Sequence, residues 1–114
     1  GNISTPKTIL MKSARDRDTN VAYNVACNPN VPREALTILA ERRNIGILVA
    51  VVRNKNTPEE ALAKLARNNN RNLRLLIAEH ENTSRETLEF LLLKAVKEAD
   101  QKLAETVRLA LAKQ

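Results

Sequence analysis

The chain has 114 residues, enough for one domain with a buried core but short for an enzyme of two domains. Apolar residues make up 43% of it, and because Tyr23 and Phe90 are its only aromatic residues, Leu, Ile, Val and Ala must build the core. Two Gly and four Pro leave little material for the tight turns of an all-β protein, so we predict an all-α fold.

The net charge of +6 is distributed unevenly. Residues 1–78 carry 13 basic and 6 acidic residues, a net charge of +7, whereas residues 79–114 carry 6 and 7, a net charge of −1. Such an excess suits an anionic partner, although a charged solubilising surface is its commoner cause. No apolar run approaches the roughly 20 residues of a membrane span, and the single Cys27 excludes an internal disulfide. We therefore expect a soluble, cytoplasmic protein.

The chain begins with Gly1 rather than Met, as a fragment of a longer protein would. The first repeat starts almost at once, without a polar helix to cover it. We expect that either more protein precedes this end or the end associates with another surface.

A 26-residue repeat runs through most of the chain. The stretch "NPNVPREALTIL" at 28–39 returns as "NKNTPEEALAKL" at 54–65. Such a repeat is typical of stacked helical units, each of which cannot bury its own apolar face. We predict one repeat domain over 1–114, with units at about 4–29, 30–55, 56–81 and 82–114. The apolar columns of these units are Leu10, Leu36, Leu62 and Leu88; Ala14, Ala40, Ala66 and Leu92; Val21, Ile47 and Leu73; and Val25, Val51 and Ile77.

Each unit opens with an apolar group of helical spacing, which in the third unit lies at 61–66. We predict Thr57 as the N-cap of this helix, Pro58 as its first residue and Glu60 as the partner that completes a capping box. The box recurs in the fourth unit as Thr83 with Glu86. Val31 and Thr5 lack it, so the corresponding helices of the first two units are expected to fray.

A second apolar group follows in each unit and predicts a second, shorter helix. In the third unit this group, at 73–78, comes after the turn "RNNNRN". The units close at Asn28, Asn54 and His80, where Asn tolerates the left-handed conformation that ends helices.

Three segments, "VACNPNVPREALTILA", "VVRNKNTPEEALAKLA" and "IAEHENTSRETLEFLL", resemble the leucine-rich repeat variant family. The resemblance covers roughly residues 4–93 and includes Leu73–Arg74. Departures are Leu48 and Ala22 at the position of Arg74, and Ser84 where the family has Pro. The resemblance implies a short right-handed α-solenoid in the style of HEAT and armadillo arrays. It implies no reaction, because the family is defined by the shape of its repeat.

The C-terminal segment leaves the 26-residue register. The stretch "VRLALA" at 107–112 echoes "LRLLIA" at 73–78 at a spacing of 34, so eight residues have been added. We predict a longer, capping helical segment. Its apolar stripe is expected at Val96, Ala99, Leu103, Val107 and Ala110 or Leu111.

Residues suited to catalysis are few. The single cysteine, Cys27, is expected to be a small buried side chain, and the single histidine, His80, a solvated turn residue about two units away. The sequence contains no metal-ligand cluster, phosphate-binding Gly loop or nucleotide motif. We predict neither an enzyme nor a cofactor.

Basic residues gather in the turns between the two helices of each unit, where stacked units would line one edge. Charges in the last turn of a helix are favoured by its dipole, so a solvated edge explains many of them. A ladder of charge could also follow an anionic partner. The candidate binding edge comprises Arg15, Arg17, Arg42, Arg43, Arg67, Arg71, Lys94 and Lys97.

We therefore predict a non-catalytic interaction module that holds another protein or a neighbouring domain. The alternative is nucleic-acid binding through the basic edge, although stacking platforms are scarce. A repeat-fold enzyme acting on DNA is disfavoured, because the sequence does not supply a pocket with aromatic residues and an acid.

Overall fold

The computed structural model describes residues 6–114, so the predictions for Gly1 and Thr5 lie outside the described residues. Within this range the chain forms eight helices and no strand, which confirms the all-α prediction. None of these helices is long and apolar enough to cross a membrane. The helices are α1 (Lys7–Ala14), α2 (Thr19–Cys27), α3 (Arg33–Leu39), α4 (Ile45–Arg53), α5 (Glu59–Leu65), α6 (Arg71–Glu79), α7 (Arg85–Lys97) and α8 (Gln101–Ala112).

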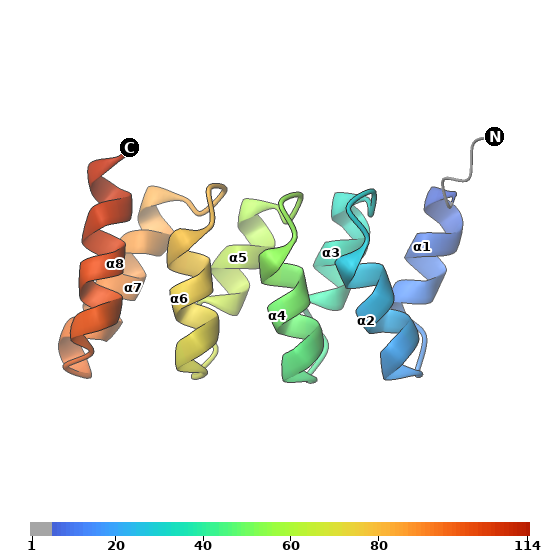
Figure 1. The fold of residues 1–114 in the computed structure, drawn as a ribbon, viewed down its shortest axis with the longest axis horizontal. Helices are drawn as coiled ribbons and strands as arrows, with labels where there is room; N and C mark the ends of the chain where they lie inside the picture. The colour runs from blue at the N-terminus through green and yellow to red at the C-terminus, as the bar shows by residue number, and fades with distance from the viewer. Residues whose placement is uncertain (1–5) are drawn as a thin grey trace.

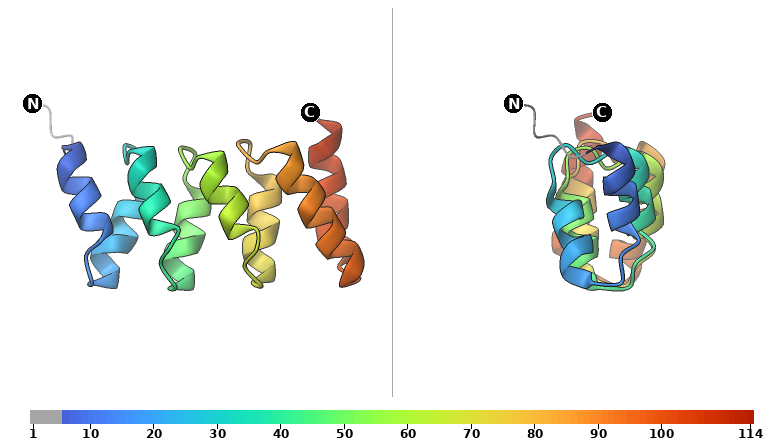
Figure 2. Two further views of the ribbon diagram at one scale, coloured as in Figure 1. Left: turned by 180° about the vertical axis from the view of Figure 1, so that it is seen from behind. Right: turned by 90° about the vertical axis from the view of Figure 1, so that its right-hand side faces the viewer.

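The helices stand in two layers along the molecule, which measures 48 × 27 × 17 Å (Figure 1). Helices α2, α4, α6 and α8 form the front layer in Figure 1, and α1, α3, α5 and α7 lie behind them. The end-on view in Figure 2 shows the two layers side by side. Within the front layer α2 packs on α4, α4 on α6 and α6 on α8. Each helix pair therefore contacts the next pair along the row.

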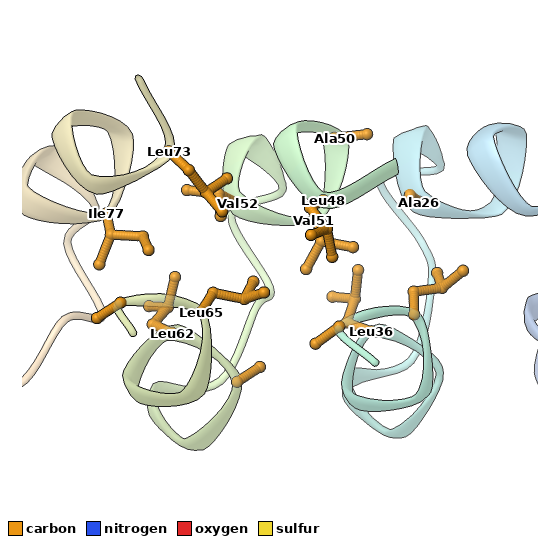
Figure 3. Close-up of a cluster of buried hydrophobic side chains, with 14 of the residues drawn as sticks. Ala26, Leu36, Leu48, Ala50, Val51, Val52, Leu62, Leu65, Leu73 and Ile77 are labelled. Atoms are coloured by element: carbon orange, nitrogen blue, oxygen red, sulfur yellow. The ribbon is translucent and has the colours of Figure 1, made fainter. Parts of the chain in front are cut away.

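The core lies between the two layers, where the predicted apolar columns meet. In Figure 3 the side chains of Leu36 and Leu62, from the rear layer, point toward those of Val51 and Ile77 from the front layer. All four are fully buried. The predicted columns are buried at Leu10, Leu36, Leu62, Leu88, Ala14, Ala40, Ala66, Ile47, Leu73, Val25, Val51 and Ile77, and half-buried at Val21 and Leu92.

The predicted capping boxes are wrong. Pro58 has an extended ψ of 159° and is itself the N-cap of α5, so the helix begins one residue later than predicted. The hydroxyl of Thr57 donates instead to the carbonyl oxygen of Val51 in α4, and that of Thr83 donates to the carbonyl oxygen of Ile77 at 2.6 Å. Both threonines are buried. They therefore satisfy carbonyl groups near the end of the preceding helix.

Side-chain caps occur at the front-layer helices, where the sequence analysis did not place them. Each cap accepts a hydrogen bond from a backbone N–H in the first turn of its helix, as Asp and Asn commonly do. In the rear layer Ser84, which replaces the expected Pro, caps α7 by accepting from the backbone N–H of Thr87 at 3.1 Å. The front-layer caps are Asp18, Asn44, Asn70 and Asp100.

The turns from each front-layer helix to the next rear-layer helix form an edge that we call the asparagine edge, at 28–32, 54–58 and 80–84. Asn54 Nδ2 donates to the carbonyl oxygens of Ala26 at 2.9 Å and Asn28 at 3.0 Å, one unit back. His80 repeats the bridge, with Nε2 lying 2.9 Å from the carbonyl oxygen of Asn54. The predicted left-handed conformation is wrong, because φ at Asn28, Asn54 and His80 lies between −73° and −76°. The side chains of Asn54 and His80 therefore join their turns to the preceding ones.

The last two helices are the longest, with 13 residues in α7 and 12 in α8. The N-cap of α8, Asp100, follows that of α6, Asn70, by 30 residues. The buried Leu103 and Val107 follow their buried counterparts in α6 by the same interval. The predicted offset of 34 is therefore wrong, and the insertion amounts to four residues, about one helical turn.

The chain turns from α7 to α8 at Ala99, whose φ of 55° is the only positive value at a non-glycine residue in 6–114. The backbone N–H of Asp100 donates to the carbonyl oxygen of Ala95 at 2.8 Å, the longer bond of a Schellman motif. Val96 and Ala99, predicted in the buried stripe, are exposed because they lie at this reversal. Leu103 and Val107 are buried as predicted, and Ala110 and Leu111 are half-buried.

Candidate functional site

The eight residues of the predicted basic edge lie at or beside the turns from a rear-layer helix to its front-layer partner, along the lower side of Figure 1. Two of them join neighbouring helix pairs through hydrogen bonds. Arg42 Nη1 donates to the carbonyl oxygens of Ala14 at 3.0 Å and Asp16 at 2.9 Å. Arg71 donates through Nε and Nη2 to the carboxylate of Asp100, at 2.7 and 2.9 Å. These residues therefore hold the row of helix pairs together.

Two more residues of the basic edge have nearby partners. Lys94 pairs with Glu98 one turn later, at 3.7 Å. The guanidinium of Arg67 in the α5–α6 turn lies 5.2 Å from the centre of the Phe90 ring in α7, within the range of a cation–π contact. The remaining four, Arg15, Arg17, Arg43 and Lys97, are exposed and have no ion pair or side-chain hydrogen bond within residues 6–114.

A ninth basic residue, Arg74, was missing from the predicted edge and is almost fully buried. Its Nε donates to the carbonyl oxygen of Asn68 at 3.0 Å, and its Nη1 donates to Glu98 Oε1 at 2.8 Å. The hydrogen bond from Arg74 lowers the pKa of Glu98, and that from Arg71 lowers the pKa of Asp100. The charges of this edge near α6–α8 are therefore largely paired.

The structure does not bring Cys27 and His80 into one site, and it corrects the surroundings predicted for both. Cys27 is exposed, as are Arg53 and Glu79 at the positions 26 and 52 residues later. His80 is half-buried, and its Nδ1 accepts a hydrogen bond from the backbone N–H of Asn82 at 3.0 Å. The two residues line different cavities. Within 6–114 no three His, Cys, Asp or Glu residues are grouped so as to hold a metal ion.

A groove of about 500 Å³ between α2 and α4, which we call the α2–α4 groove, is a further candidate site. The sequence analysis did not predict it. Four of its lining residues, Pro29, Asn54, Lys55 and Asn56, belong to the asparagine edge. Its lining residues are Tyr23, Ala26, Cys27, Pro29, Gly46, Val49, Ala50, Arg53, Asn54, Lys55 and Asn56.

The α2–α4 groove combines an apolar floor with a polar rim. Val49 and Ala50 are half-buried and buried in α4, whereas Tyr23 on the facing wall is 46% exposed. The pKa of Tyr23 is raised, chiefly by hydrogen bonding with Cys27 one turn later, while the charge of Arg53 opposes the change. The arrangement suits recognition of a side chain that is apolar at its tip and polar at its base.

A larger cavity of about 730 Å³ lies in the rear layer between α5 and α7. Its charges are mixed, with Glu59 and Glu86 near Lys64 and Arg67. Glu59 Oε1 already accepts a hydrogen bond from the Thr87 hydroxyl at 3.2 Å. Because residues of both charges line this cavity, it would not select a partner by the sign of the partner's charge.

Comparison with known proteins finds no matching family model, no matching curated protein and no matching solved structure. The resemblance to the leucine-rich repeat variant family stays a prediction.

Proposed function

We propose that this chain is a non-catalytic scaffold that binds another protein through the α2–α4 groove. In this interpretation the row of helix pairs is a short right-handed α-solenoid of four repeats, with the longer α7–α8 pair as its cap. Hydrogen bonds between residues 26 to 28 apart, such as those of Asn54 and Arg42, support the repeat. Stacked repeats of this kind present extended surfaces on which partners bind.

The observation that carries the proposal is the exposed apolar surface beside this groove. Tyr23, which lines the groove, is 46% exposed, and Ile45, which precedes the lining residue Gly46 in the sequence, is 44% exposed. Both belong to the front layer. Tyr is enriched at the centres of protein interfaces because it buries a large area with few rotatable bonds. A partner that covered these residues would remove apolar surface from water at little conformational cost.

A peptide-display selection against the folded chain tests the proposal. We expect enriched peptides to bind the wild type and to bind Tyr23→Ala at least about tenfold more weakly, since a central aromatic anchor commonly contributes more than 1.4 kcal/mol. Leu109→Ala is the matched control, because Leu109 is an exposed apolar residue of the same layer on α8. Failure to enrich any peptide, or an equal loss with Leu109→Ala, would overturn the proposal.

Nucleic-acid binding is the second candidate, favoured by the exposed Arg15, Arg17 and Arg43 on two successive turns. Neutralised phosphates make log Kd depend steeply on log salt, with a slope of roughly one per contact. Titration with unrelated oligonucleotides at about 50 and 200 mM salt tests it. If the wild type does not bind, or its affinity does not depend on salt, this edge does not bind nucleic acid. The same conclusion follows if the triple variant with Gln at these positions keeps the steep salt dependence.

A further inference from the structure

We infer that the α2–α4 groove binds an acidic segment of a partner protein that inserts one apolar side chain between α2 and α4. This inference rests on the proposed function and specifies the chemistry of the partner. Three observations support it: the shape of the floor, the sign of the charges on the rim, and the reversal of those charges farther along the row.

Gly46 lines the groove in the first turn of α4 and contributes no side chain to it. A Cβ atom there would lie 3.1 Å from Asn44 Oδ1, the oxygen that caps the helix. The volume of about 500 Å³ falls within the range of roughly 300–1,000 Å³ typical of ligand pockets. One large aliphatic or aromatic side chain would contact Val49 and Tyr23 there.

The rim carries positive charge only. Arg53 and Lys55 line the groove, and no Asp or Glu does. Both side chains are exposed, and neither makes an ion pair within the described residues. Two cations without paired acids create a local positive potential, which attracts carboxylates and speeds their association.

The same two repeat positions have the opposite charge one unit farther on. Glu79 and Glu81 follow Arg53 and Lys55 by 26 residues, and both line the groove between α6 and α8. An acidic segment is therefore attracted at the α2–α4 groove but meets two carboxylates, beside Lys113, at the groove between α6 and α8. Repulsion at alternative positions is one way in which repeat surfaces select a single binding register.

An acidic polypeptide fits these observations better than a nucleic acid. Aliphatic residues form the floor of the groove, and Tyr23 is the one aromatic residue that lines it. Proteins that bind single strands usually stack several bases on aromatic side chains. A phosphate backbone also requires a path of cations, but Arg53 and Lys55 are followed along the layer by Glu79 and Glu81.

The test uses labelled synthetic dodecapeptides as probes in fluorescence anisotropy. The first carries one Trp flanked by Glu residues, the second replaces each Glu with Lys, and the third replaces Trp with Gly. We expect the first to bind most tightly and to weaken between about 50 and 200 mM salt, because exposed charges are screened over about 10 Å. The inference would be overturned if the Lys peptide bound as tightly as the Glu peptide, or if replacing Trp with Gly left the affinity unchanged.

Charge reversal on the protein locates the site. Arg53→Glu should weaken the acidic probe at least about tenfold and strengthen the basic one, since a like charge at a binding rim is repulsive. The matched control is Arg43→Glu, because Arg43 is also an exposed arginine but lies at the opposite edge; it should leave both affinities within about twofold. Equal losses in the two variants would show that only net charge matters and would overturn the inference.

The outcomes separate this inference from the proposed function. If display-selected peptides depend on Tyr23 but show no preference for acidic residues, the function stands and the inference fails. If neither selected nor acidic peptides depend on Tyr23 or Arg53, both fail. Displacement of the acidic probe by an unrelated oligonucleotide, lost in Arg53→Glu, would identify a nucleic-acid site in place of the peptide site.

Discussion

Asn54 offers the sharpest test of how neighbouring helix pairs are held together. It is only 8% exposed, and its side chain makes three hydrogen bonds: two donated to the carbonyl oxygens of Ala26 and Asn28, and one accepted from the backbone N–H of Asn56 at 2.9 Å. Asn54→Ala removes all three and leaves buried backbone groups without partners. The variant therefore loses the bridge between two units while its helices keep their sequences.

The expected cost follows from the number of bonds and their burial. A neutral hydrogen bond contributes about 1 kcal/mol net, and an unsatisfied buried group costs about 1–3 kcal/mol, so Asn54→Ala should destabilise the fold by about 3 kcal/mol. Asn56 is the matched control, because it lies in the same turn but is exposed and donates a single side-chain bond, to the carbonyl oxygen of Pro29 at 2.8 Å. Asn56→Ala should cost about 1 kcal/mol or less.

Urea unfolding followed by the helical circular dichroism signal measures both free energies of unfolding. The structure predicts a difference of about 2 kcal/mol between the two variants, with an unchanged dependence on urea. Equal losses would refute the bridging role of Asn54, because they would mean that its burial and its additional hydrogen bonds contribute nothing beyond the single side-chain bond of Asn56.

Four further outcomes are expected. Leu62→Ala should cost about 2–5 kcal/mol in urea unfolding, because Leu62 is fully buried; a cost below about 1 kcal/mol would contradict the core. Ala99→Gly should stabilise the fold by about 1 kcal/mol, since φ of 55° is strained for Ala; a loss of thermal stability would contradict this. The pKa of Asp100 is lowered from 3.8 by Arg71, so this pair stabilises the fold above that pH and is lost as pH falls through the folded pKa. Asp100→Asn, which retains a capping oxygen, should therefore lose less stability than the wild type during acid titration below about pH 4; parallel curves would exclude the pair. Finally, Cys27 is exposed and should react with a maleimide as fast in buffer as in denaturant, whereas slow native labelling would contradict its placement.

The sequence predicted most of the helical core, because positions 26 residues apart place apolar side chains on the same face of successive helices. Leu36 and Leu62 are buried as their column requires. It predicted the turns poorly, since Asn favours several local structures. Asn54 was expected to end a helix in the left-handed conformation, but its amide instead bridges to the preceding unit. That choice depends on a neighbour 26–28 residues away, which the local sequence does not show.

The candidate site was harder to predict for the same reason. Charge and spacing indicated a basic edge, but two of its residues are already engaged in the fold. Arg42 and Arg71 donate hydrogen bonds to residues of adjacent helix pairs. Residues of two helices line the α2–α4 groove, Tyr23 from α2 and Gly46 from α4 among them, so neither residue signals it alone. The change of charge from Arg53 to Glu79 is visible in the sequence. The structure adds that both residues lie on the front layer, where one partner could contact them.

The most direct test of the proposed binding surface is an amide chemical-shift map of the ¹⁵N-labelled chain during titration with the acidic Trp peptide. The structure predicts that the largest shifts cluster at Tyr23, Val49 and Arg53, that they grow with peptide concentration to saturation, and that Arg53→Glu needs at least about tenfold more peptide to reach the same shifts. Shifts centred instead on Arg15 and Arg43 at the opposite edge, or shifts that saturate at the same peptide concentration in the variant, would contradict binding at the α2–α4 groove.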